Sequence, residues 1–235
     1  MNLLPTDGKL CSFNCIYCEC GLNENHRTRS KLPTRAEVKE ALIHKLSSMQ
    51  AEGVAPDVIT FAGNGEPTMH PEFAGIIDDT IETRNRFFPK AKIAVLSNST
   101  MLYKEDVFQA LNKIEDNILK LDSISDSRIG QLNVPNSPAF TFDRLLEQLC
   151  RFNGNLIIQT MFLKGEVNGE SVTNTTEHEI SGWLEALKQI KPKQVMIYTI
   201  DRETPVKNLK KVTKDELEAI ADRARQEGFE VMVSA

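Results

Sequence analysis

Short apolar segments alternate with amphipathic helices along most of the chain, and this order restricts the folds that the sequence can adopt. Six segments have the length and apolar content of buried strands: 57–62, 92–97, 117–121, 156–163, 194–200 and 229–233. Periodicity and capping boxes predict the helices: 34–49, one beginning near 71, 104–114, 141–152, 175–190 and 213–228. Strands joined by helices form right-handed crossovers, so we expect an α/β fold with a parallel sheet and functional loops at the C-terminal ends of its strands.

We expect this sheet to stay open, because six strands are fewer than the eight of a closed barrel. A curved partial barrel and a doubly wound sheet both fit that number. The 235 residues contain no linker, low-complexity tract or internal repeat, so they are predicted to form a single domain, 1–235. Residues 2–4 are expected to add a short first strand. Residues 164–176, rich in Gly, Asn, Ser and Thr, are expected to form a long loop suited to a lid or a substrate loop.

Composition limits the environment and the partners of the chain. With 40% hydrophobic residues and a formal net charge of −5, it is typical of an ordinary globular protein. No apolar run reaches the ~18 residues that a membrane span needs, and the first residues do not resemble a signal peptide, so a cytoplasmic protein without membrane contact is expected. The acidic balance also argues against binding nucleic acid mainly through a large basic surface.

Four of the five cysteines lie within ten residues, at Cys11, Cys15, Cys18 and Cys20. Disulfides between cysteines this close would stabilise the fold little, and nothing in the sequence indicates an oxidising compartment. A metal or redox role is therefore favoured over ordinary buried thiols.

The first three of these thiols, from Cys11, Cys15 and Cys18, are spaced by four and three residues. Three thiolates on one loop can hold three irons of a cubane iron–sulfur cluster and leave the fourth iron open. Cys20 keeps two alternatives open, a four-cysteine cluster and a tetrahedral zinc site, although structural zinc usually takes two knuckles separated by a longer insert.

These cysteines resemble the Cys-x3-Cys-x2-Cys motif of the radical S-adenosylmethionine (radical SAM) superfamily, including an aromatic residue, Tyr17, before the third cysteine. The segment 61–67 is similar to the Gly-Gly-Glu-Pro motif of that superfamily, with Asn64 as a departure from the glycine pair. Within the superfamily, the segment around the cysteines looks most like iron–sulfur oxidoreductases related to the wybutosine tRNA-modifying enzymes. Gly21 stands where that group usually has an arginine, soon after the third cysteine.

The resemblance implies a partial (βα)6 TIM-type barrel with a cluster loop at about 9–32. It implies that Cys11, Cys15 and Cys18 hold a [4Fe-4S] cluster, that SAM binds the open iron, and that Cys20 is not a ligand. A reduced cluster would cleave SAM to methionine and a 5′-deoxyadenosyl radical, which would abstract hydrogen from a substrate. An electron donor such as flavodoxin or ferredoxin is then the expected partner.

The substrate is left open at this level, with a tRNA base or a small molecule as the first hypothesis. Glycyl-radical activation and peptide modification are alternative reactions within the same superfamily. Outside enzymes, the alternative is a four-cysteine iron–sulfur or zinc protein that uses Cys20.

Polar residues at two strand ends are candidate cofactor contacts. Gly63 and Gly65 allow close backbone approach, so carbonyl groups of this turn, together with Glu66, can meet the SAM ammonium. An ordinary turn is the alternative. Ser97 and Asn98 offer hydroxyl and amide groups to the carboxylate or ribose of SAM, with a helix cap as the alternative.

Later strands supply further candidates. Asp122 ends an apolar strand and can hold a ribose hydroxyl or a substrate group. Gln159, within the apolar segment 156–163, is interpreted either as an amide that faces the pocket and binds SAM or as a satisfied core amide. The resemblance implies adenine contacts from Tyr17 and from Tyr198.

Asn64 and Arg202 are the candidates for substrate contact, Arg202 through a carboxylate or phosphate. A local ion pair of Arg202 with Asp201 or Glu203 is the alternative. The basic residues of 26–31 are interpreted as solvated loop charge, with phosphate or RNA contact as the alternative. The remaining side chains of interest are expected to be structural or exposed: His44, His70, His178 and Cys150.

Overall fold

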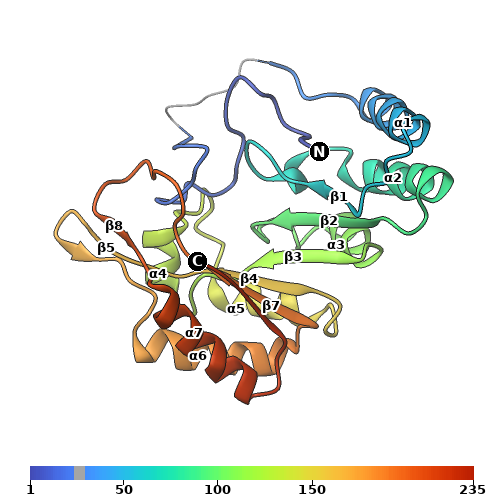
Figure 1. The fold of residues 1–235 in the computed structure, drawn as a ribbon. Coiled ribbons are helices and arrows are strands. Elements are labelled where there is room, and N and C mark those ends of the chain that lie inside the picture. The colour runs from blue at the N-terminus through green and yellow to red at the C-terminus, as the bar shows by residue number, and fades with distance from the viewer. Residues whose placement is uncertain (24–29) are drawn as a thin grey trace.

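A six-stranded parallel sheet forms the centre of the computed structural model, which describes residues 1–23 and 30–235 (Figure 1). Its strands lie side by side in chain order: β1 (Val58–Phe61), β2 (Lys92–Ser97), β3 (Asp116–Lys120), β4 (Ile157–Met161), β7 (Gln194–Tyr198) and β9 (Val231–Ser234). β1 and β9 are the two edges, so the sheet is open. The predicted α/β class, the parallel pairing and the six strands are confirmed.

Helices precede the first strand and connect the strands, and most of them cover one face of the sheet. They are α1 (Arg35–Ala51), α2 (Phe73–Phe87), α3 (Glu105–Asn112), α4 (Asp126–Leu132), α5 (Phe142–Cys150), α6 (Glu177–Ile190) and α7 (Lys214–Gln226), with a 3-10 turn at Pro67–Met69. The sequence did not predict α4, because seven residues are too few to establish a helical period. None of the helices in the described ranges is long and apolar enough to cross a membrane.

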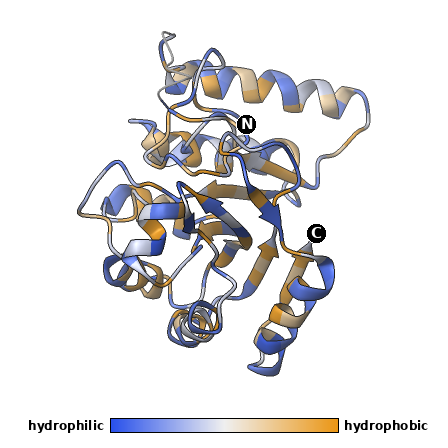
Figure 2. Cartoon of the chain, turned by 90° about the vertical axis from the view of Figure 1, so that its left-hand side faces the viewer, coloured by the Kyte–Doolittle hydropathy of each residue, from blue (hydrophilic) through white to orange (hydrophobic). Residues whose placement is uncertain are grey.

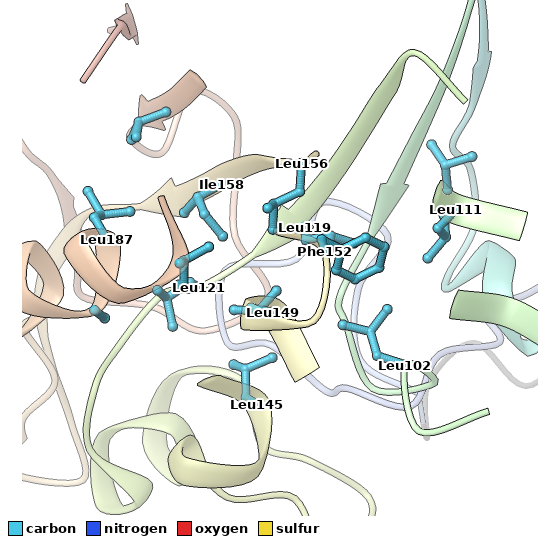
Figure 3. Close-up of a cluster of buried hydrophobic side chains, with 14 of the residues drawn as sticks. Leu102, Leu111, Leu119, Leu121, Leu145, Leu149, Phe152, Leu156, Ile158 and Leu187 are labelled. Atoms are coloured by element: carbon cyan, nitrogen blue, oxygen red, sulfur yellow. The ribbon is translucent and has the colours of Figure 1, made fainter. Parts of the chain in front are cut away.

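The main hydrophobic core lies between these helices and the sheet. Side chains alternate along β2, where Ile93 and Val95 join this core while Ala94 and Leu96 point to the opposite face. Figure 3 shows Leu119 and Ile158 of the sheet packed among leucines of the helices and connections. The helices in Figure 2 carry apolar and polar stripes, as expected for helices with one face against the core. We call the other side of the sheet the inner face.

Capping boxes begin two of the helices where the sequence predicts them. Thr34 accepts a hydrogen bond from the Glu37 backbone, and the Glu37 carboxylate accepts one from the Thr34 backbone at 2.7 Å. Thr213 and Glu216 form the same pair at the start of α7. These reciprocal bonds satisfy N–H groups that a helix leaves unpaired at its N-terminus.

Residues 2–4 do not form the expected strand. Only Met1 pairs along β1, where its carbonyl accepts a hydrogen bond from Ala62 N at 3.0 Å. The Leu4 backbone N–H donates instead to the side chain of Asn2 at 3.0 Å, and Pro5 follows. This side-chain bond replaces a ladder bond, so the chain turns away from the sheet. The sixth strand of the sheet is therefore β9.

Residues 164–176 do not form the expected long loop. They contain most of a hairpin of β5 (Leu163–Val167) and β6 (Glu170–Ser171), and β5 also pairs with β8 (Leu209–Lys211) in a separate antiparallel sheet. The turn residues Asn168 and Gly169 both have positive φ, 53° and 82°. Asn-Gly is the dipeptide that two-residue hairpin turns favour, and the composition of the segment obscured this signal.

Replacing a core residue of β3 should reveal the contribution of the helix-covered face. We expect Leu119→Ala, at a position with no exposed surface, to lower the free energy of unfolding by about 2–5 kcal/mol. Val58→Ala, on the exposed edge strand β1, serves as the control and should change it by less than about 0.5 kcal/mol. Urea denaturation followed by circular dichroism measures both. Equal losses in the two variants would contradict this assignment of the core.

Candidate functional site

The loop that carries the four clustered cysteines crosses the C-terminal ends of the strands. In Figure 1 the strand arrows of β2 and β3 point toward the side on which this N-terminal segment runs. At one end of the loop, Leu10 N donates to Asn64 O at 3.0 Å and Glu66 N donates to Leu10 O at 2.9 Å. At the other end, Ile16 N donates to Leu132 O at 3.0 Å. The turn after β1 and the end of α4 therefore hold the loop from two sides.

The four thiols differ in burial and in their neighbours. Cys15 is buried, and the other three are partly exposed. The Asn98 amide donates to Cys11 Sγ at 3.5 Å, and the Asn133 amide donates to Cys15 Sγ at 3.6 Å. N–H donors aimed at cysteine sulfur stabilise the thiolate form that a metal requires.

The surroundings raise the pKa of three of these thiols and lower the pKa of the fourth. Burial and the charge of Glu66 raise the pKa of Cys11 to about 12. Burial also raises the pKa of Cys15. A hydrogen bond from Cys20 lowers the pKa of Cys18, and the same bond raises the pKa of Cys20.

The geometry bears on the kind of group that these residues fit. No set of three or more His, Cys, Asp or Glu side chains in residues 1–23 and 30–235 converges closely enough to hold a single metal ion. A cubane cluster does not need that convergence, because each thiolate binds a different iron. Three thiols on one loop, two of them with amide donors aimed at their sulfurs, fit such a cluster.

Glu66 ties the turn after β1 to the end of β2. Its carboxylate is buried and accepts hydrogen bonds from Ser97 Oγ at 2.9 Å and from the backbone N–H groups of Asn98 at 2.6 Å and Thr68 at 3.0 Å. Burial raises the pKa of Glu66, and these hydrogen bonds oppose the shift. Both carboxylate oxygens are already used by protein donors, so Glu66 positions the turn.

Gly63 and Gly65 lie where no side chain fits. A Cβ atom on Gly65 would come within 1.7 Å of Leu10 O, the atom that accepts from Glu66 N. On Gly63 a Cβ would come within 2.3 Å of Asn2 Oδ1. The glycines therefore permit the close backbone pairing of the turn with the cysteine loop.

Asn98 connects the same strand end to the loop. Besides its contact with Cys11, its amide donates to Ser12 Oγ at 2.9 Å, and its Oδ1 accepts from Thr100 Oγ1 at 2.7 Å. The Asn98 side chain is therefore neither the cap of a following helix nor an amide without hydrogen-bond partners. Ser97 and Asn98 thus hold the loop and the turn together.

A buried polar network surrounds Asp122 just after β3. Its Oδ2 accepts from Tyr17 OH and from the Asn133 amide, the latter at 2.7 Å, and its Oδ1 accepts from Met161 N at 3.0 Å. Desolvation raises the pKa of Tyr17, and Asp122 adds to the shift. Lys120 Nζ lies 3.5 Å from Asp122 Oδ2. The carboxylate is thus occupied by protein groups of the loop, of α4 and of the sheet.

Three polar side chains of the inner face lie beside this network. Lys120 Nζ donates to Tyr198 OH at 3.2 Å and lies between the rings of Tyr17 and Tyr198, 5.4 Å and 5.6 Å from their centroids. Burial favours the neutral amine, but Asp122 and Tyr198 outweigh it and raise the pKa of Lys120. Gln159, paired in register with Lys120, is half-buried, and its amide has no hydrogen bond to the rest of the described chain. This free amide favours the pocket-facing interpretation over the satisfied core amide.

The other predicted site residues lie farther out. Arg202 pairs with Glu19 of the cysteine loop at 2.8 Å, and both side chains are largely exposed, so neither Asp201 nor Glu203 is its partner. The Asn64 amide donates to Pro5 O at 3.4 Å. Of the basic segment, residues 26–29 lie outside the described residues. The three histidines and Cys150 are structural or exposed, as expected. His44 and His178 are exposed, the His70 ring is hydrogen-bonded to Pro33 O, and Cys150 packs against the main core.

The sequence did not predict three residues that contact the cysteine loop or Asp122: Lys9, Lys120 and Asn133. Lys120 left a signal, because a lysine within the apolar run 118–121 needs a partner. Asn133 left none, since it follows a helix that the pattern did not predict.

Comparison with known proteins finds relatives in sequence and in fold. No family model matches the sequence. The chain is 30% identical over 222 residues to a UPF0026 protein of Helicobacter pylori, covering 91% of this chain and 65% of the relative. It is 27% identical over 214 residues to a GTPase Obg of Brachyspira hyodysenteriae, covering 89% of this chain and 29% of the relative. The chain thus spans less than two thirds of either relative.

Solved structures show the fold. A crystal structure of SuiB from Streptococcus suis bound to S-adenosylmethionine matches 97% of this chain and 49% of its own length, with a TM-score of 0.68 and 14% identity. A structure of TYW1 with a lysine–pyruvate adduct bound matches 93% and 70%, with a TM-score of 0.62 and 16% identity. These neighbours are radical SAM enzymes, and the chain has their partial-barrel fold. The resemblance drawn from the cysteine motif is confirmed for the fold.

The pairing of the turn with the cysteine loop leads to a direct test. We expect Gly65→Ala to lower the free energy of unfolding by about 2–3 kcal/mol, because the new Cβ must displace Leu10 O. The control is Gly130→Ala in α4, where a Cβ meets nothing within 4 Å and alanine favours the helix by up to about 1 kcal/mol. Chemical denaturation measures both. Equal stability of Gly65→Ala and the wild type would contradict the close approach.

Proposed function

We propose that this protein is a radical SAM enzyme in which Cys11, Cys15 and Cys18 hold a [4Fe-4S] cluster. The observation that carries the proposal is the three-thiol loop, fastened across the C-terminal edge of a partial barrel by the turn 63–66. When bound, such a cluster supplies the electron that cleaves SAM to methionine and a 5′-deoxyadenosyl radical, which then abstracts hydrogen from the substrate.

The protein's own groups prepare the thiols for this ligand. Asn98 and Asn133 donate to the sulfurs of Cys11 and Cys15, which favours the thiolates and fixes the loop. In this proposal Cys20 is not a ligand; its thiol lies 3.8 Å from Gly63 O, beside the turn.

For SAM, the backbone of the turn and the inner face offer complementary groups. Carbonyl groups near Gly63 and Gly65 suit the SAM ammonium, and Lys120 with the free amide of Gln159 suits its carboxylate or ribose. Tyr17 and Tyr198 bring aromatic surface to the same side, as the adenine hypothesis requires.

Other candidate contacts act through neighbours in this proposal. Glu66, Ser97 and Asn98 hold the turn and the loop, because their polar atoms bond to each other and to the loop. Asp122 fixes Tyr17 and Lys120 rather than meeting a ribose hydroxyl with free oxygens. The contact of Asp122 with a ribose hydroxyl or a substrate group stays a prediction. It would require a ligand that displaces one of these donors.

A tRNA base or a small molecule remains the first hypothesis for the substrate. On the inner face, Ala94, Ile118 and Ile157 form a buried apolar cluster on the N-terminal side of Lys120. The polar groups of this face therefore lie near its C-terminal edge, which favours a small reacting group there. Asn64 and Arg202 border this edge as substrate candidates, with the Arg202–Glu19 pair available to exchange for an anion. Flavodoxin or ferredoxin in the cytoplasm is the proposed source of electrons.

Removal of single cysteines tests the ligand set. After anaerobic reconstitution, Cys11→Ala, Cys15→Ala and Cys18→Ala should each lose most of the iron and the EPR signal of a reduced [4Fe-4S] cluster. Cys20→Ala should retain both, and SAM should change its EPR signal. Iron analysis, EPR and chromatography of 5′-deoxyadenosine formed with dithionite are the measurements. Loss of the cluster in Cys20→Ala would favour the four-cysteine alternative, and a cluster indifferent to SAM would sink the enzyme hypothesis.

Lys120→Met tests the proposed contact with the SAM carboxylate. We expect the Kd for SAM to rise tenfold or more, because a charge-assisted hydrogen bond contributes about 1.5–3 kcal/mol. Asp122 keeps its bonds to Tyr17, Asn133 and Met161, so the fold should persist, which circular dichroism checks. Lys90→Met, exposed before β2, is the matched control. Anaerobic titration calorimetry giving the same Kd for both variants would assign Lys120 to the protein network alone.

A further inference from the structure

Lys9 is a buried lysine at the start of the cysteine loop, and the proposed reaction gives it no role. Its residue is 4% exposed, and its Nζ donates to Gly21 O at 2.7 Å. Gly21 follows Cys20, so this one bond joins the two ends of the segment that carries all four thiols. Lysine is rarely buried without an anionic partner, because removing its charge from water is costly.

The Lys9 ammonium lies at the end of the segment that carries the thiols, because Gly21, whose carbonyl it bonds, donates its own N–H to Cys18 O at 2.9 Å. No carboxylate of residues 1–23 or 30–235 forms an ion pair with it, whereas the other lysine of the site, Lys120, has Asp122. The Lys9 ammonium acts on the thiols of Cys11, Cys18 and Cys20, favouring the thiolate in each case. For Cys15 the corresponding charge is Lys120.

We propose that Lys9 is a positioning residue that closes the cysteine loop through Gly21 and raises the reduction potential of the bound cluster. The inference rests on the proposed function only in needing the cluster. Three thiolates give the site a net negative charge, and reduction adds one more negative charge. A fixed ammonium beside the sulfurs therefore stabilises the reduced state more than the oxidised state. The backbone bond at Gly21 keeps that ammonium in place.

Lys9→Met removes the charge and keeps the length of the side chain, and Lys9→Arg keeps the charge. Each is prepared as the full chain and reconstituted anaerobically with iron and sulfide, and the cluster is titrated against redox mediators and followed by EPR. At a fixed solution potential, the ratio of reduced to oxidised cluster should fall about tenfold in Lys9→Met, equivalent to about 59 mV for one electron. Lys9→Arg should remain near the wild type. Lys45→Met, exposed on α1, is the control and should not change the ratio.

An unchanged ratio in Lys9→Met would overturn the proposal, and so would an equal fall in Lys9→Met and Lys9→Arg, because charge would then not be the cause. If Lys9→Met keeps its circular dichroism spectrum but loads no iron, normal loading of Lys9→Arg supports the proposal and failure of both contradicts it. The measurement does not require cleavage of SAM. A wild type that forms the cluster without cleaving SAM would therefore refute the proposed enzyme while leaving the test of Lys9 intact.

Discussion

The buried carboxylate of Glu66 is the interaction on which the geometry of the site depends. It collects donors from the turn after β1 and from the end of β2, two segments that the sheet already places side by side. The same turn pairs with Leu10, and Asn98 reaches from the strand end to Ser12. A buried carboxylate is stable only while such donors remain, so the sheet and the loop hold each other in register. The cysteines thus take their positions from the sheet rather than from the loop alone.

Charges around the thiols are arranged in opposing pairs. Glu66 raises the pKa of Cys11 and Lys9 acts against it, while Asp122 raises the pKa of Cys15 and Lys120 acts against it. Carboxylates alone would keep these thiols protonated, and lysines alone would leave the apo site with excess positive charge. The two charges of each pair therefore act in opposite directions on the thiolate form of the same cysteine. The cysteine loop also has a lysine ammonium on each side: Lys9 near its two ends and Lys120 toward the inner face.

Much of the fold follows from local sequence, and the reasons for success and failure are physical. The strand predicted at 92–97 matches β2 exactly, because its apolar run is bounded by turns, and both capping boxes form as their spacing predicts. The hairpin in 164–176 was missed because its polar composition hides a two-residue turn. At the site, the cysteine spacing indicated a metal or redox role, whereas the glycines of 63–65 left an ordinary turn as the alternative.

Contacts distant in sequence were beyond reach of such patterns. Asp122 is identifiable as a polar residue at a strand end, but only the fold shows that Tyr17, 105 residues away, already bonds to it. In the same way Arg202 finds Glu19 across 183 residues, whereas local reasoning offered its neighbours. Sequence indicates which residue types can do chemistry at an edge. The fold decides which of them are already bonded to the protein.

One part of the molecule lies outside the common parallel sheet. In this chain the separate antiparallel sheet of β5, β6 and β8 lies outside the repeated strand–helix pattern. Asn174, after the hairpin, donates to the backbone carbonyls of Asp122 and Met161, both at 2.7 Å. The hairpin is therefore tied through one buried amide to the backbone at Asp122 and at the end of β4.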